Sequence, residues 1–263
     1  MSSGSWPQTH FLCTPKNKIL KKNLDHQKKH FIERYFDTHK IIKSKFRLPF
    51  AAGSKYVGPL EKYEKYRSHT KIEEIIKLDK NVVYIKPFGK SLDLLKLTKS
   101  PDNIKKYRPS KITENYGKNK HQHDYYDYEK TFQNLNYNKK ILKTLFKLSQ
   151  SRAMLKNQVK DKHILSIYAF PNWKIFYKKA FKNDVKNNSD YHIGDIKFNL
   201  ENIDEKKKIN KTAIFLHHKA LFAALSGTAH WNNLELGAHK LVRRNPEVYN
   251  SDIVNFLNFL SIG

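Results

Sequence analysis

The stretch Thr212–Ser226, TAIFLHHKALFAALS, decides the fold class that the sequence predicts, because apolar residues become dense there. Ten of its fifteen residues are apolar, and they surround a helix drawn through the segment instead of lining one stripe. A helix that is apolar on all sides is expected to be buried. Gly227 then provides a natural end for this helix. The stretch is therefore predicted to be a buried helix and the start of a C-terminal apolar module.

Two further helices are predicted in this module. Thr228 can cap a second helix, which would end at Arg243 and Arg244 with Pro246 just beyond it. Its apolar residues fall on one face: Trp231, Leu234, Ala238 and Leu241. Ser251 and Asp252 are expected to begin a third helix, with these apolar residues: Ile253, Phe256, Leu257 and Leu260. The short joins favour antiparallel packing of three helices over residues 211–263.

The last helix suggests a protein-docking surface. Phe256 and Phe259 flank it, so one of them is expected to face a partner, and Trp231 is a third docking candidate. The alternative is that upstream chain folds back over the helix. The first helix is interrupted by His217, His218 and Lys219. A membrane-spanning helix needs about 20 consecutive apolar residues, so no membrane span is expected.

The charge of the chain is strongly basic and unevenly distributed. Lys and Arg number 51 against 24 Asp and Glu, which gives a formal net charge of +27. Residues 1–210 carry +25 of this charge and residues 211–263 carry +2. Only seven of the basic residues are Arg, which is typical of AT-rich coding, but such coding does not deplete acidic residues. So large a charge opposes compaction unless a polyanion neutralises it. Nucleic acid is the commonest such partner, and an acidic protein polymer or an anionic membrane face are the others.

A long basic helix is predicted from Lys16 to Phe46. Apolar residues recur every eleven positions in two series, which places them along one seam: Leu20, Phe31 and Ile42, and Leu24, Tyr35 and Phe46. Lysines on the other face are expected to contact a polyanion, although a solvated helix surface would have the same pattern. The candidate nucleic-acid-binding residues are Lys18, Lys21, Lys22, Lys28, Lys29, Lys43, Lys45, Arg47, Lys105, Lys106, Arg108 and Lys111.

The overall prediction is a mainly α protein with a few short strands. Five regions are expected: an extended arm over 1–15, a basic helical region with a short strand over 16–99, a basic Tyr-rich linker over 100–140, a mixed helix and strand region over 141–210, and the apolar docking module over 211–263. Helices are predicted at 59–78, 138–159 and 172–181. Strands are predicted at 82–85, 163–170 and 191–200. The tyrosines of the linker could stack on bases, or the linker could simply be solvated.

The sequence contains no recognisable catalytic constellation. Its nine glycines form no phosphate-binding loop, and its one cysteine, Cys13, excludes a disulfide framework and a thiolate zinc site. A metal site at His217 and His218 with His230 and His239, and an acid–base pair of His192 and Asp195, are weak matches. We therefore expect no enzyme activity, no cofactor and no metal.

These observations predict a non-catalytic structural subunit of a ribonucleoprotein. The expected host is an organellar, mitochondrial ribosome, in which Lys-rich faces contact rRNA or another polyanion and the apolar helices contact neighbouring proteins. Residues 1–24 contain no acidic residue, as in mitochondrial targeting segments, although Pro7 and Pro15 would break a helix there. The alternatives are a basic scaffold on an acidic lattice such as a microtubule, in the cytoplasm or cytoskeleton, or an accessory subunit of a large mitochondrial complex.

Overall fold

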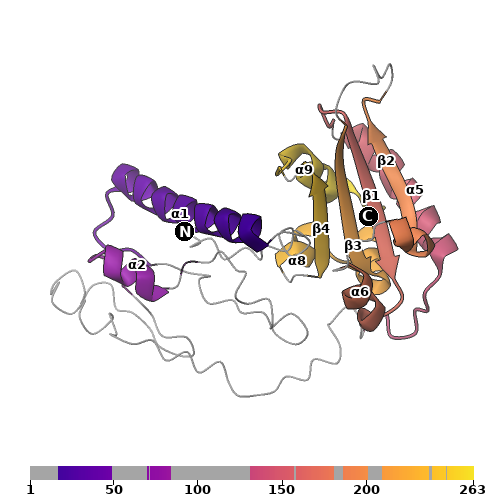
Figure 1. Ribbon diagram of the computed structural model, residues 1–263, viewed down its shortest axis with the longest axis horizontal. Coiled ribbons are helices and arrows are strands. Elements are labelled where there is room, and N and C mark those ends of the chain that lie inside the picture. Colours follow the sequence, from indigo (N-terminus) through magenta and orange to yellow (C-terminus); the bar gives the residue numbers. More distant parts are fainter. Residues whose placement is uncertain are drawn as a thin grey trace. The chain divides into compact units, whose positions relative to one another are not determined.

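The structure, a computed structural model, describes residues 17–48, 70, 72–83, 131–156, 158–180, 186–200, 209–236, 239–246 and 248–263. The chain divides into two compact units. Unit 1 contains two described helices, and unit 2 contains a four-stranded sheet with the remaining helices (Figure 1).

Unit 1 is organised around the predicted basic helix. Helix α1 (Asn17–Ile42) is confirmed, and α2 (Ile72–Leu78) falls inside the helix predicted over 59–78. A small core joins them through Tyr35, Ile75 and Val82. Only part of the predicted eleven-residue seam is buried, because Tyr35 is buried while Ile42 is 60% exposed. The strand predicted at 82–85 is represented by one parallel bridge between Arg47 and Val82, and residues 84 and 85 lie outside the described residues.

Unit 2 is built on a mixed sheet. Its strands are β1 (His163–Phe170), β2 (His192–Phe198), β3 (Asn210–His217) and β4 (Lys240–Asn245). The strand order is β2-β1-β3-β4. The central strands β1 and β3 are parallel, and each outer strand is antiparallel to its neighbour. The strands predicted at 163–170 and 191–200 are confirmed as β1 and β2. The sheet contains two strands from residues 141–210 and two strands that lie almost wholly in residues 211–263.

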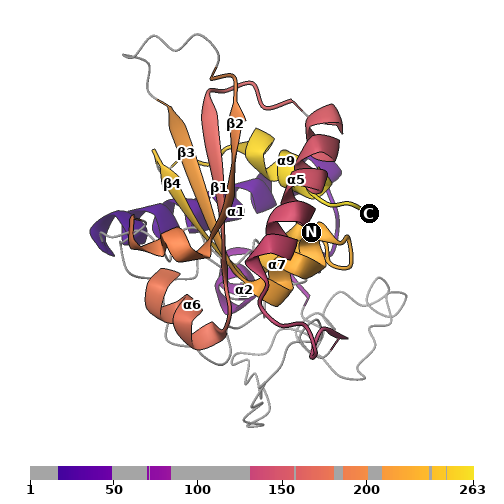
Figure 2. The same ribbon diagram turned by 90° about the vertical axis from the view of Figure 1, so that its right-hand side faces the viewer.

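The helices of unit 2 are placed on both sides of this sheet. They are α5 (Lys139–Lys156), α6 (Trp173–Ala180), α7 (His218–Leu225), α8 (Trp231–Leu236) and α9 (Ser251–Phe259), with a 3-10 helix, η3 (Lys186–Tyr191), before β2. Helices α5, α7 and α9 cover one face (Figure 2). Helix α6 lies against the other face, where Phe176 contacts Phe170 edge to face. The helices predicted at 138–159 and 172–181 are therefore confirmed as α5 and α6.

The prediction of a mainly α fold with a C-terminal three-helix module is wrong. The opening stretch is two elements: its first half is β3 and its second half is α7. A short apolar run fits a buried strand as well as a buried helix. As a central strand, β3 is buried on both faces, with Ile214, Phe215 and Leu216 all inaccessible to solvent. The change from strand to helix occurs at His217, whose Nδ1 accepts a hydrogen bond from the Lys219 backbone N–H at 3.3 Å.

The second predicted helix is also two elements. Helix α8 ends at Leu236, and Leu241, Arg243 and Arg244 lie in β4 instead. Gly237 separates the two parts in the sequence, and glycine disfavours helix continuation. The third predicted helix is confirmed as α9, and Asn250 caps it by accepting hydrogen bonds from the backbone N–H groups of Asp252 and Ile253.

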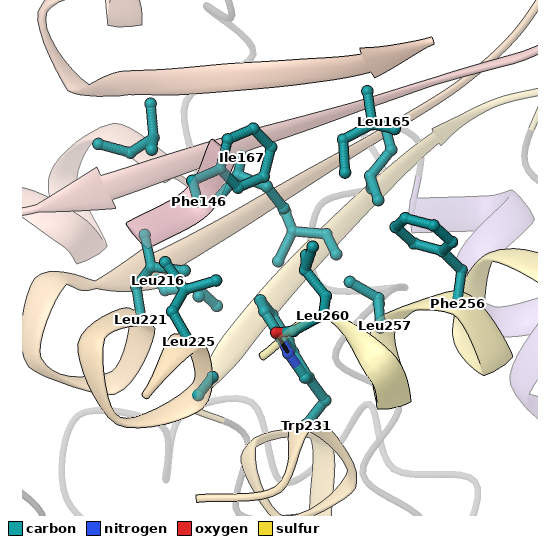
Figure 3. Packing of buried hydrophobic residues seen from close by; sticks show 14 of the residues in the cluster. Phe146, Leu165, Ile167, Leu216, Leu221, Leu225, Trp231, Phe256, Leu257 and Leu260 are labelled. Atoms are coloured by element: carbon teal, nitrogen blue, oxygen red, sulfur yellow. Dashed lines mark hydrogen bonds between the residues drawn. The ribbon is translucent and has the colours of Figure 1, made fainter. Parts of the chain in front are cut away.

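The core of unit 2 lies between the sheet and helices α5, α7 and α9 (Figure 3). Trp231 is buried there, and its Nε1 donates a hydrogen bond to the Leu260 carbonyl at 2.9 Å. Helix α5 approaches β2 closely at Gly194. A Cβ atom at that position would lie 2.6 Å from Cε1 of Phe146, so the absence of a side chain there sets the distance between helix and sheet.

Candidate polyanion-binding surface

Among the described elements that contain no acidic residue, helix α5 has the most basic residues. Its sequence, KKILKTLFKLSQSRAMLK, contains six basic residues and no acidic one. Asn138 begins it by accepting a hydrogen bond from the Ile141 N–H at 3.1 Å. The buried face packs on the core through Leu142, Phe146, Ser149 and Ala153. Because this face is anchored to the sheet, the opposite face has a fixed position on unit 2.

Three lysines occupy the outward face of α5. Lys140, Lys143 and Lys147 are exposed and follow one another at spacings of three and four, so they form a single ridge. No acidic side chain within the described residues pairs with them. Unpaired ammonium groups keep their full attraction for an external anion. We call these three residues the α5 lysine ridge.

Two other basic residues of α5 have structural partners. Lys139 Nζ donates to the backbone carbonyls of Ser189 and Asp190 at 3.2 and 2.8 Å, which ties α5 to η3. Arg152 donates to the carbonyls of Ser261 and Gly263, which ties the C-terminal segment to the helix. These contacts hold α5 in place without using the lysine ridge.

Several of the basic residues predicted to bind nucleic acid are paired within unit 1. Lys28 Nζ lies 2.6 Å from Oε1 of Glu74, and Lys29 Nζ lies 3.8 Å from Oε1 of Glu33. Arg47 Nη1 lies 2.5 Å from Oδ2 of Asp79. The cationic face of α1 is therefore partly neutralised by the protein's own carboxylates.

The remaining predicted residues divide into exposed and undescribed ones. Lys22, Lys43 and Lys45 are exposed, and the Lys45 ammonium lies 5.6 Å from the Phe46 ring centroid. Lys18 and Lys21 belong to α1, but their side chains lie outside the described part of the chain. Four more candidates lie wholly outside it: Lys105, Lys106, Arg108 and Lys111. Of the candidate nucleic-acid-binding residues, Lys28 and Arg47 each pair with an acidic residue in or next to α2. The structure does not describe the remaining candidates as one cluster.

Arg47 belongs to a buried network that holds unit 1 together. Asp79 accepts hydrogen bonds from Tyr35 Oη at 2.7 Å, from Arg47, and from the Asn81 N–H at 2.9 Å. Burial acts to raise the pKa of Asp79, but these hydrogen bonds and the Arg47 charge outweigh it and leave the pKa below its usual value. Burial, with Asp79 adding to it, raises the pKa of Tyr35. The Arg47 guanidinium thus stabilises an internal carboxylate.

The predicted docking residues have different environments. Trp231 and Phe256 are buried in the core of unit 2, where Phe256 contacts Phe198 edge to face. Phe259 is 44% exposed. Of the two phenylalanines that flank the last helix, the outward one is therefore Phe259, and Trp231 and Phe256 serve packing within the chain.

The histidine cluster lies at the carboxyl ends of β1 and β3. Trp173 stacks on His217 with ring centroids 4.9 Å apart, and the His217 and His218 rings are 4.6 Å apart. Burial, with the neighbouring charges adding to it, lowers the pKa of His217 to about 3 and of His218 to about 4. Burial also lowers the pKa of His239, which contacts Trp173, to about 4. All three imidazoles are therefore neutral near pH 7.

This cluster is not arranged as a metal centre. Within the part of the chain that the structure describes, no three His, Cys, Asp or Glu side chains are grouped to hold a metal ion. His230 is exposed, and its Nδ1 accepts the Asn232 N–H at 3.3 Å. The aromatic contacts and the capping bond of His217 give the cluster a packing role.

The pair of His192 and Asp195 does form. His192 Nε2 lies 2.9 Å from Oδ1 of Asp195 on β2. Burial acts to raise the pKa of Asp195, but hydrogen bonds from Ser166 and His192 outweigh it and lower the pKa overall. This contact engages both the Asp195 carboxylate and the His192 imidazole.

Comparison with known proteins gives no match: no family model, no curated protein and no solved structure resembles this chain significantly. Among the described helices, none is long and apolar enough to cross a lipid bilayer.

The lysine ridge of α5 was not among the predicted binding residues. Its signal is present in the sequence, because α5 combines three lysines at helical spacing with a complete lack of acid. The predictions emphasised α1, where lysines are more numerous but Asp25, Glu33 and Asp37 accompany them.

Proposed function

We propose that this protein is a non-catalytic, RNA-contacting subunit of a ribonucleoprotein, with an organellar ribosome as its host. The observation that carries the proposal is the lysine ridge of α5, a cationic surface fixed on the core of unit 2 with no acidic partner among the described residues. Lysine ammonium groups that contact phosphates displace condensed counterions, which supplies affinity without sequence specificity. The exposed lysines Lys22, Lys43 and Lys45 of unit 1 provide further cationic surface.

The net charge supports a polyanionic partner of considerable size. A chain with a formal charge of +27 repels itself, and a small anion would neutralise little of that charge. RNA is preferred over an acidic protein lattice because nucleic acid is the commonest partner of so strongly basic a chain. In the ribosomal setting the protein would reside in the mitochondrion.

The proposal is tested by the salt dependence of RNA binding. Full-length protein is titrated onto a fluorescein-labelled 30-nucleotide RNA hairpin between 50 and 300 mM KCl, and the association constant is measured by anisotropy. Replacing Lys140, Lys143 and Lys147 with Gln should reduce the slope of log K against log [KCl] by roughly two to three, at about 0.7 for each phosphate no longer neutralised in a single strand and about 0.9 in a duplex. Gln preserves helix propensity, so α5 remains folded.

A matched control comes from unit 1. Replacing the paired Lys28 and Lys29 with Gln removes two positive charges that already have carboxylate partners, so the slope should change much less. An unchanged slope in the α5 variant would contradict the proposal. Tight binding to microtubules that disappears when the acidic tubulin tails are removed, together with salt-independent RNA binding, would favour the acidic-lattice alternative.

A further inference from the structure

Helix α5 exposes an apolar stripe beside its lysine ridge. Ile141, Leu148 and Leu155 are 45%, 57% and 88% exposed although all three are aliphatic. They are spaced seven residues apart, so they lie nearly in line along the helix, over a length of about 21 Å at 1.5 Å per residue. Met154, which precedes Leu155, is 44% exposed. The stripe is an ordered surface on the anchored helix, and none of the described residues of the chain covers it.

The residues around the stripe define the chemistry of what it could bind. Thr144 and Ser151 lie on the outward face between its members, so the apolar surface is narrow. Lys140 directly precedes Ile141 and Lys147 directly precedes Leu148, which places an ammonium group beside each of the first two members. No acidic residue of α5 balances these charges.

We propose that the apolar stripe of α5 is the docking site for an acidic amphipathic helix of another protein. A seven-residue apolar repeat supplies one of the two apolar positions per heptad along which two helices pack, and Thr144 and Ser151 occupy the other. The flanking lysines complement Glu or Asp residues at the edges of the partner's seam, where charge pairs set partner choice. The occupant is therefore a helix with aliphatic residues at heptad spacing and carboxylates on the side that faces Lys140 and Lys147.

The shape of the stripe distinguishes this partner from other anions. RNA phosphates would pair with the lysines but would leave three aliphatic side chains in water. A bilayer takes up amphipathic helices whose apolar face is broad, whereas this stripe is one side chain wide and is bounded by hydroxyl groups. A protein helix satisfies both the apolar and the cationic parts.

This inference shares Lys140 and Lys147 with the proposed RNA contact, but the two can be tested separately. Lys143 lies about 140° around the helix from Leu148, at 100° per residue, so it belongs to the RNA-facing ridge and not to the seam. Removing the aliphatic residues without changing charge therefore tests docking alone, and replacing Lys143 alone tests RNA binding alone.

The experiment uses a designed acidic peptide as the probe. The peptide is a 28-residue fluorescein-labelled helix with Leu at the seam positions and Glu at the flanking ones, and its binding to full-length protein is measured by anisotropy at 100 mM KCl. Replacing Ile141, Leu148 and Leu155 with Gln should weaken binding at least tenfold. The Leu155→Gln substitution alone should weaken it less, because no lysine precedes that residue. The same substitution at Ile41, which is 81% exposed on α1, is the matched control and should leave binding unchanged.

The variants must retain the far-ultraviolet circular dichroism of the native protein, and parallel titrations use the RNA hairpin and phosphatidylglycerol vesicles. Docking of an acidic helix is supported if peptide binding falls while RNA binding does not. The inference is overturned if the peptide does not bind the native protein, if the triple Gln variant binds it equally well, or if only vesicle binding depends on the stripe.

Discussion

At the scale of single residues, Gly194 illustrates how one position sets the spacing between layers. Its neighbour across the interface is the Phe146 ring, and any Cβ at position 194 would overlap it. Phe146 is buried in the close-packed core, so any movement of its ring away from β2 would disturb its neighbours. A glycine in the middle of β2 is unfavourable by itself, so its presence reflects this close approach.

The Gly194→Ala variant should therefore be less stable, by about 1–3 kcal/mol as for other overpacked cores. A smaller side chain at the facing position should relieve the overlap, so Phe146→Leu combined with Gly194→Ala should be less destabilising than the two single changes added together. Urea denaturation followed by circular dichroism measures all four proteins. Additive effects would show that the two residues do not interact.

At the scale of elements, each prediction depended on whether the apolar residues of the segment recur at a regular spacing. Helices α1 and α5 were predictable because their apolar residues recur at helical spacing, and β2 was predictable from its alternation. The stretch containing β3 and α7 has neither signal, since both halves are largely buried all round. Its division into strand and helix is decided by pairing with β1 and β4, which are distant in sequence.

The same limit applies to the candidate surface. Charge on α5 could be read from the sequence, but which apolar residues of α5 face outward could not. Leu142 and Ile141 are adjacent and chemically alike, yet the first is buried and the second is exposed. That distinction depends on the orientation of the helix on the sheet. Likewise, the pairing of Arg47 with Asp79 joins two residues that are 32 positions apart in the sequence.

Helices α1 and α2 provide a prediction at this scale. Asp79→Asn removes the carboxylate that Tyr35 and Arg47 share and leaves the mostly buried guanidinium without a counter-charge. The free energy of unfolding of unit 1 should fall by about 3 kcal/mol, as when a buried pair loses one partner. Loss of helix signal from α1 with urea measures this effect.

The control for this prediction is Glu33→Gln. It breaks the exposed pair with Lys29, in which the side chains of Lys29 and Glu33 are 77% and 54% accessible, so the destabilisation should stay below about 1 kcal/mol. If Asp79→Asn is as stable as Glu33→Gln, the network does not support unit 1.

At the scale of the whole molecule, the buried histidines make stability depend on pH. The pKa of His217 is about 3 and those of His218 and His239 are about 4 in the folded protein, compared with 6.5 for an ordinary histidine. The unfolded chain therefore binds more protons below pH 6.5 than the folded one. Their contribution to stability is complete above pH 6.5 and is lost as the pH falls towards 4.

Each such histidine contributes a slope of up to about 1.4 kcal/mol per pH unit in that window. The His217→Asn variant keeps a side-chain acceptor for the Lys219 N–H but cannot titrate, so its free energy of unfolding should vary less steeply between pH 6.5 and 4. Denaturation at pH 7.5, 6.0, 5.0 and 4.5 provides the measurement. A slope in the His217 variant equal to that of the native protein would contradict the assignment.

The parallel pairing of β1 with β3 also governs when this protein can become folded during its synthesis. His163 of β1 pairs with Asn210 of β3, so β1 must wait for a strand that is translated 47 positions later. Until then the described nascent part of unit 2 has helices α5 and α6, the 3-10 helix η3 and the antiparallel β1–β2 pair. Leu165 and Ile167 still lack the partners from β3, α7 and α9 that later surround them. Native assembly of unit 2 is therefore a late event of translation, and a polypeptide that stalls before β3 emerges would present an aggregation-prone strand pair to chaperones.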